Sequence, residues 1–93
     1  MPVLFAFHEV DNGQVWANAW KKRAKSRHEM FAKIGVKCRN FRDPNNPNVT
    51  GVLLDVPDMK KFESFMQSDE AKKAMKEDGL KVATLRILGE FTP

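Results

Sequence analysis

Only a few side chains in this 93-residue chain combine a reactive group with an unusual position, and His8 is the first of them. It lies within a nearly continuous apolar and aromatic stretch at residues 3–10. A neutral imidazole, whose pKa is usually about 6.5, can act there as a base or hold a ligand oxygen. The alternative is structural, with the ring satisfied by a backbone carbonyl or exposed at a sheet edge.

Arg27 is the least expected residue of the sequence. On a helix phased on Trp16 it falls close to the centre of the apolar stripe, and Arg23 falls just beside it. A guanidinium that faces the core has to be paired, because a desolvated charge alone is too costly. Arg27 is therefore a candidate catalytic residue and Arg23 a candidate substrate contact. The partner is either an anionic ligand or a carboxylate of the chain, such as Glu9, Asp55 or Glu90.

Trp16 and Trp20 stand one helical turn apart and are candidates for the wall of a binding pocket, although aromatic residues at helical spacing also serve as plain core. On the strand expected at residues 36–42, Asn40 shares one face with Cys38 and Arg42, and the opposite face carries Lys37, Arg39 and Phe41. Which face meets the helices is open. Asn40 is the candidate ligand contact on this strand.

Several classes of chemistry are disfavoured by the residue types present. The two histidines and the single Cys38 give no cluster with metal-ligand spacing, so no metal is expected. There is no glycine-rich phosphate loop and no glycine-rich nucleophile elbow, so no nucleotide cofactor is expected either. Cys38 lacks a sequence partner that marks a nucleophile and is expected to be an inert, buried thiol.

The charge balance is mildly basic, with 16 Lys and Arg against 12 Asp and Glu, a net charge of +4. The basic segment at residues 21–27 favours nucleic acid, but residues 49–56 lack the stacking aromatic side chains that an RNA-recognition sheet requires. Nucleic-acid binding is therefore disfavoured. No apolar run reaches the roughly 18 residues of a membrane span, and residues 1–10 do not resemble a signal peptide. A cytoplasmic location without membrane attachment is the expectation.

The periodicity of the chain predicts six elements around these residues. Residues 3–10, 36–42, 49–56 and 80–91 are expected to be strands, and a turn of Asp, Pro and Asn residues at 43–48 joins the second and third into a hairpin. A long helix is expected over residues 16–34, with Gly35 as its stop. A second helical segment follows Pro57-Asp58, kinks near Gln67-Ser68 and ends at Gly79.

The order βαββαβ predicts one α+β, ferredoxin-like domain over residues 1–93, with a four-stranded antiparallel sheet and helices on one face. The first strand carries apolar groups on both faces, such as Ala6 and Phe7. The uncovered face should therefore pack against another sheet. A homodimer is the expected assembly, since so short a chain buries only about 60–65% of its unfolded surface.

The chain resembles the dimeric α+β barrel superfamily, in its antibiotic-biosynthesis-monooxygenase-like branch. The resemblance covers nearly the whole chain and rests on the element order, the 43–48 turn and the segment 55–70, in which a strand runs into a helix carrying Phe62 and Phe65 before a Ser68-Asp69 step. It implies a small-molecule pocket between sheet and helices. Members include cofactor-free monooxygenases, isomerases and haem-degrading enzymes, but the Asn, Trp and His of the haem-degrading members have no counterparts here.

These observations together predict a homodimer that holds a small aromatic or anionic molecule near His8, Trp16, Trp20 and Arg27. If the protein is an enzyme, the resemblance implies cofactor-independent oxidation or isomerisation, with His8 as proton acceptor and Arg27 stabilising a developing enolate. The rival hypothesis is a non-catalytic ligand-binding or assembly module. An RNA-binding domain is the third.

Overall fold

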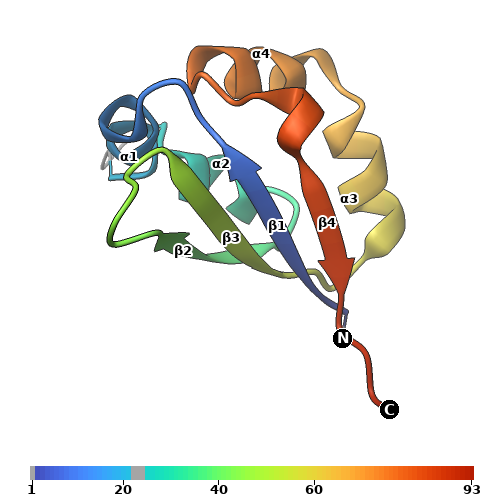
Figure 1. The fold of residues 1–93 in the computed structure, drawn as a ribbon. Helices are drawn as coiled ribbons and strands as arrows, with labels where there is room; N and C mark the ends of the chain where they lie inside the picture. The colour runs from blue at the N-terminus through green and yellow to red at the C-terminus, as the bar shows by residue number, and fades with distance from the viewer. Residues whose placement is uncertain (1, 22–24) are drawn as a thin grey trace.

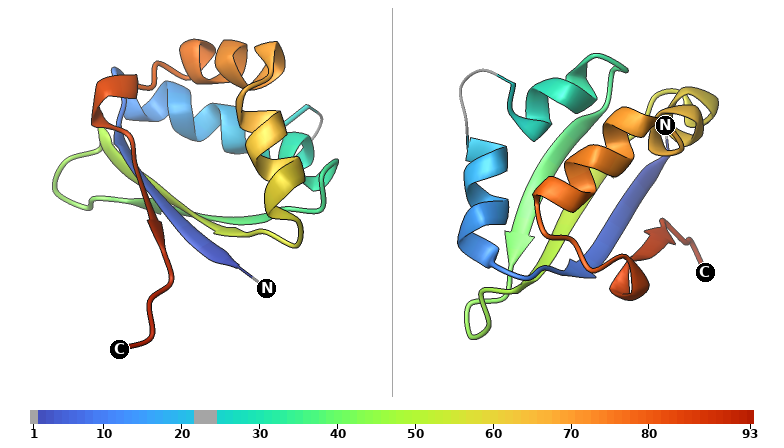
Figure 2. Two further views of the ribbon diagram at one scale, coloured as in Figure 1. Left: turned by 90° about the vertical axis from the view of Figure 1, so that its right-hand side faces the viewer. Right: turned by 90° about the horizontal axis from the view of Figure 1, so that it is seen from above.

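The structure is a computed structural model that describes residues 2–21 and 25–93. It consists of one antiparallel sheet with strand order β2-β3-β1-β4 and a layer of helices on one side (Figures 1 and 2). The strands are β1 (Val3–Glu9), β2 (Lys37–Arg42), β3 (Val49–Asp55) and β4 (Arg86–Gly89). The predicted α+β, ferredoxin-like βαββαβ arrangement is confirmed.

The register between the two central strands decides which side chains meet the helices. β1 and β3 pair with Ala6 opposite Val52 and His8 opposite Thr50. Because successive side chains of a strand alternate between the two faces, His8 and Ala6 point towards the helices, whereas Phe5 and Phe7 point away. His8, Ala6, Val52 and Thr50 are all buried. The hydrophobic core lies between this face of the sheet and the helices.

The single helix predicted over residues 16–34 is wrong. The structure has two helices there, α1 (Gly13–Lys21) and α2 (Arg27–Ala32), and residues 22–24, including the candidate Arg23, lie outside the described residues. Ser26 caps α2 by accepting a hydrogen bond from the Glu29 backbone N–H, and Glu29 accepts one from the Lys25 backbone N–H. Ser26 and Glu29 thus begin a new helix in the manner of a capping box.

The second helical segment follows the prediction closely. α3 (Met59–Met66) is capped by Asp58, and α4 (Asp69–Glu77) is capped by Ser68, which accepts a hydrogen bond from Ala71 N–H. The predicted break at Gln67-Ser68 is confirmed, because a serine that caps one helix cannot continue the helix before it. Gly79 follows α4 at φ 70°, a left-handed conformation that favours glycine.

The last strand is shorter than predicted. Of residues 80–91, only β4 is a strand; a 3₁₀ turn, η1 (Val82–Thr84), precedes it, and Leu80 makes a single bridge to Val10. Two hydrogen bonds favour the turn over a longer strand. The Thr84 side chain donates to the Lys81 carbonyl, and the Glu9 N–H donates to the Thr84 hydroxyl. Apolar composition alone did not distinguish a strand from this capped turn.

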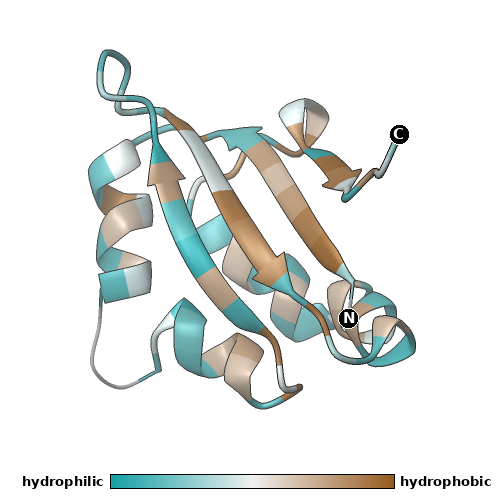
Figure 3. Cartoon of the chain, turned by 90° about the horizontal axis from the view of Figure 1, so that it is seen from below, coloured by the Kyte–Doolittle hydropathy of each residue, from teal (hydrophilic) through white to brown (hydrophobic). Residues whose placement is uncertain are grey.

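Within residues 2–21 and 25–93, no helix covers the second face of the sheet, which is seen directly in Figure 3. Its centre is apolar: Phe7 is 39% exposed, Phe41 43% and Leu88 60%. Phe5 lies against Phe41, with ring centroids 5.6 Å apart. We call this surface the open face and define it by Phe5, Phe7, Phe41 and Leu88.

The start of α1 is held against the β2–β3 turn by a close backbone approach. Gly13 N–H donates to the Asn48 side chain at 2.8 Å, and a Cβ on Gly13 would lie 1.8 Å from the Pro47 carbonyl oxygen. Only glycine fits at this position. The contact fixes the helix that carries Trp16 and Trp20.

Replacing Gly13 by Ala is expected to destabilise the fold by about 3 kcal/mol, because the clash is with backbone and the turn has to move. Gly89→Ala is the matched control, since its Cβ would meet nothing closer than Leu4 at 3.9 Å. Urea unfolding measures both. Equal stability of the two variants would show that the turn yields without cost.

Candidate functional site

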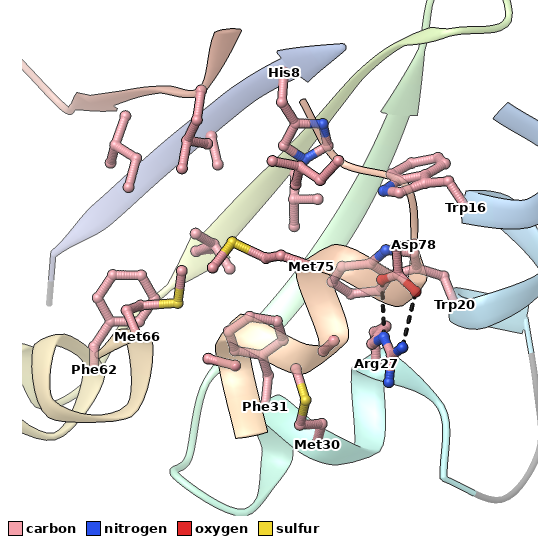
Figure 4. Close-up of a pocket in the computed structure, with 18 residues that line it drawn as sticks. His8, Trp16, Trp20, Arg27, Met30, Phe31, Phe62, Met66, Met75 and Asp78 are labelled. Atoms are coloured by element: carbon pink, nitrogen blue, oxygen red, sulfur yellow. Dashed lines mark hydrogen bonds and ion pairs between the residues drawn. The ribbon is translucent and has the colours of Figure 1, made fainter. Parts of the chain in front are cut away.

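A cavity of about 70 Å³ lies between the sheet and the helices (Figure 4). Its lining is almost entirely apolar, with polar groups concentrated at one end. Trp16, Trp20, Arg27 and Asp78 lie on one side, and Phe62 and Met66 on the opposite side. His8 projects into it from β1. The structure thus brings four candidate residues to one site: His8, Trp16, Trp20 and Arg27.

The hydroxyl of Thr50 holds the His8 side chain in place. It lies 3.0 Å from the His8 backbone carbonyl and 2.5 Å from His8 Nδ1, which are both within hydrogen-bond distance. No such contact is made by Nε2 within the described residues. Thr50 therefore fixes the orientation of the ring through one of its two nitrogens.

His8 is also kept neutral. Burial lowers its pKa below the usual value, against smaller opposing effects from a hydrogen bond to its own backbone carbonyl and from the negative charge of Asp78. An uncharged imidazole has one unprotonated ring nitrogen, which can accept a proton at neutral pH. A structural role and a functional role of His8 are compatible, because the Thr50 hydroxyl contacts only one of the two ring nitrogens, Nδ1.

The two tryptophans belong to a chain of aromatic contacts along the cavity. The Trp16 ring lies 6.0 Å from the His8 ring, edge to face, and 6.2 Å from Trp20, whose ring stacks on Phe31 at 5.9 Å. Both tryptophans are buried and are therefore core and cavity wall at once. The Trp20 Nε1–H is buried without a hydrogen-bond partner among the described residues. An orphaned buried donor of this kind is uncommon and costly.

Arg27 is paired within the chain. Its Nε donates to Asp78 Oδ2 and its Nη2 to Asp78 Oδ1, both at 2.8 Å, and Nη2 also contacts Glu77 at 3.3 Å. The hydrogen bond to Asp78 is the main reason why the pKa of Arg27 is raised. Burial acts in the opposite direction, and Glu77 adds a smaller increase. Arg27 thus pairs with a carboxylate of the chain, one of the two expected alternatives, but the carboxylate is Asp78, and the examples Glu9, Asp55 and Glu90 are wrong. They were placed on sheet strands, whereas α2 packs beside the C-terminal end of α4, where the chain supplies Asp78.

Asp78 is the site residue that sequence reasoning missed. It is buried at the C-cap of α4 and lies 51 residues from Arg27 in the chain. Its sequence setting, Glu77-Asp78-Gly79, reads as the polar end of a helix. The only available signal was indirect, because a buried arginine requires a buried carboxylate somewhere in the chain.

The remaining candidates lie outside the cavity. Asn40 is exposed on the edge strand β2, although its partner in the ladder, Val52, lines the cavity. Cys38 is half-buried beside the core, and burial raises the pKa of its thiol to about 12. A thiol held in its protonated form is a poor nucleophile, in line with the expected inertness.

The size of the cavity limits what it holds as it stands. About 70 Å³ accommodates a few water molecules and is less than half of the roughly 150 Å³ that holds benzene in an apolar protein cavity. Three of the lining side chains are methionines: Met30, Met66 and Met75. Methionine has three rotatable side-chain bonds and adapts readily to a ligand.

Within residues 2–21 and 25–93, no group of three or more His, Cys, Asp and Glu side chains is arranged to hold a metal ion. None of the helices described there has the length and apolar composition needed to cross a membrane.

The lowered pKa of His8 makes the stability of the fold depend on pH. The unfolded imidazole takes up a proton at about pH 6.5 and the folded one only at lower pH, so the unfolded state binds more protons between these values. The free energy of unfolding should therefore fall as the pH drops below about 6.5. Urea titrations of the protein and of His8→Gln measure this, and an equal pH slope in both would contradict a neutral, buried His8.

Comparison with known proteins gives structural matches alone. No family model and no curated protein sequence matches the chain. A crystal structure of an antibiotic biosynthesis monooxygenase aligns with 100% of this chain and 99% of its own, with a TM-score of 0.72 and 8% identity. A Deinococcus radiodurans protein described as a candidate antibiotic biosynthesis monooxygenase aligns with 100% of this chain and 93% of its own, with a TM-score of 0.64 and 9% identity. The chain thus has the antibiotic-biosynthesis-monooxygenase-like fold.

Proposed function

We propose that the protein binds a small aromatic, enolisable molecule in this cavity and that His8 takes a proton from it. The observation that carries the proposal is the state of His8: a buried, neutral imidazole that Thr50 orients and that lines a largely apolar cavity. A base needs to be unprotonated, oriented and removed from bulk water, and the buried His8 meets these three conditions.

The proton transfer leaves an enolate or phenolate on the ligand, whose oxygen needs a hydrogen-bond donor. The unpartnered Trp20 Nε1–H is the nearest chemical match, because it is an N–H donor already freed from water. Return of the proton to another carbon gives an isomerase. Reaction of the carbanion with O₂ gives a monooxygenase, R₂CH₂ + O₂ → R₂C=O + H₂O, which balances without an external reductant.

The fold supports the oxygenase form of the proposal. Both matching structures are described as antibiotic biosynthesis monooxygenases, one of them as a candidate. At 8% and 9% identity they bring no residue of their own to this chain. The chemistry is therefore assigned from His8 and Trp20 alone.

The test is a screen of small enolisable phenols and ketones, with binding followed by tryptophan fluorescence and proton abstraction by deuterium exchange of the activated C–H in D₂O. His8→Gln is expected to lower the exchange rate by about 100-fold or more, because general-base catalysis contributes that much, while binding is retained. Oxygen consumption then distinguishes the monooxygenase from the isomerase.

Cys38→Ala is the matched control and should exchange at the rate of the unmodified protein, since Cys38 does not line the cavity. Exchange by His8→Gln at the unmodified rate would contradict the role of His8. Binding without exchange in the unmodified protein would favour the second candidate function, a non-catalytic ligand-binding module.

We further propose that the active form is a homodimer joined through the open face. Its apolar centre is flanked by charges of both signs that share the same side of the strands, Arg39 and Arg86 against Glu9 and Asp55. A surface with an apolar centre and a mixed rim can pair with a second copy of itself about a two-fold axis.

Phe7→Glu is expected to give monomers, because it buries a carboxylate in the centre of this contact. Val15→Glu is the matched control, since Val15 is 47% exposed on α1, on the helical side of the molecule. Light scattering after size-exclusion chromatography reports the mass of each. A monomer in the unmodified protein, or dissociation by both variants alike, would exclude the open face as the interface.

A further inference from the structure

The wall of the cavity carries a balanced pair of charges. Among its described lining residues, Arg27 and Asp78 are the two with a formal charge at neutral pH, and His8 is neutral. They are joined by two parallel N–H···O bonds of 2.8 Å. The Arg27 side chain is 15% exposed and that of Asp78 9%, so the pair is largely removed from water.

This pairing changes what Arg27 offers a ligand. An anion that enters the cavity gives up its hydration and meets a cation that Asp78 already compensates. To bind Arg27 it has to displace Asp78, which would leave a buried carboxylate without a partner. A cationic ligand faces the same difficulty at Asp78, because Arg27 is then left unpaired. A neutral molecule avoids both costs.

The remaining polar groups of the wall define the ligand further. Trp20 Nε1–H offers a donor without a partner, at the same end of the cavity as the ion pair (Figure 4). Phe62 and Met66 make the opposite end apolar. The complementary molecule has a hydrogen-bond acceptor at one end and an apolar body at the other.

We infer that the Arg27–Asp78 pair is the specificity determinant of this cavity and restricts it to uncharged ligands, in particular neutral aromatic molecules with a carbonyl-type acceptor. The inference rests on the proposed function in one respect, which is that the cavity binds a ligand. It favours a neutral ligand over the anionic one that the sequence left as an alternative. Asp78 sets the selectivity by cancelling the charge of Arg27, without being the group that reacts.

Three probes of nearly identical shape test the inference: benzamide is neutral, benzoate is an anion and benzamidine is a cation at pH 7. NMR titrations give the dissociation constant of each. The unmodified protein should bind benzamide at least about tenfold more tightly than benzoate or benzamidine. A factor of about ten is the smallest effect expected when a ligand charge is buried without a free partner of opposite charge. This ranking needs no variant.

Asp78→Asn should raise the affinity for benzoate relative to benzamide by at least about tenfold, because Arg27 then lacks its main partner. Arg27→Gln should favour benzamidine in the same way. The double variant restores a wall without net charge and should again prefer benzamide, so it tests the pair even where one single variant does not fold. Glu77→Gln is the control, since Glu77 is half exposed, does not line the cavity and makes a longer, single contact of 3.3 Å with Arg27.

The outcomes separate this inference from the proposed function. If the unmodified protein binds none of the probes, the inference is overturned, whereas the proposed function is decided by its own screen of enolisable phenols and ketones. If it binds benzamide but Asp78→Asn or Arg27→Gln leaves the ratios unchanged, the inference alone is overturned. A preference of the unmodified protein for benzoate would overturn it directly and return Arg27 to the role of an anion-binding residue.

Discussion

The register between β1 and β3 is the constraint on which both surfaces of this sheet depend. A shift of one residue would turn His8 and Ala6 to the open face and Phe5 and Phe7 to the helices. One feature resists such a shift. Thr50 lies opposite His8, where its hydroxyl is within hydrogen-bond distance of both Nδ1 and the backbone carbonyl of that residue. This pairing therefore determines the position of the imidazole and which apolar side chains are left on the open face.

The Arg27–Asp78 ion pair fixes the position of two helices, as the β1–β3 register fixes the position of the strand residues. Arg27 begins α2 and Asp78 ends α4, so the two hydrogen bonds join the first and second helical segments across the mouth of the cavity. A buried ion pair gains little stability over a well-packed apolar pair, but the loss of one partner is strongly destabilising, by about 3–5 kcal/mol. Its presence here is easier to explain by the polarity it gives the cavity than by stability.

Much of this arrangement was predictable from local signals, and the failures are physical ones. The element order, the turns at Gly35 and Gly79 and the break at Ser68 depend on short-range chemistry that the sequence displays. The break before Ser26 was missed because the apolar stripe continues in phase on both sides of it, although Ser26 and Glu29 form a recognisable cap. The partner of Arg27 could not be identified from the sequence. Asp78 lies 51 residues away in the chain, and the contact depends on how α2 and α4 pack together.

A cavity wall without net charge is still strongly dipolar, and the dipole has a direction relevant to the proposed proton transfer. That transfer separates charge: an imidazolium forms at His8 and an oxyanion forms on the ligand. The negative charge of Asp78 already raises the pKa of His8, and so favours the imidazolium once it exists. In the proposed reaction the oxyanion would take Trp20 Nε1–H as its donor, because Asp78 already holds the Arg27 guanidinium. The ion pair can thus disfavour a charged ligand in the ground state and still favour the imidazolium that the proposed transfer creates, because the charge of Asp78 acts on His8.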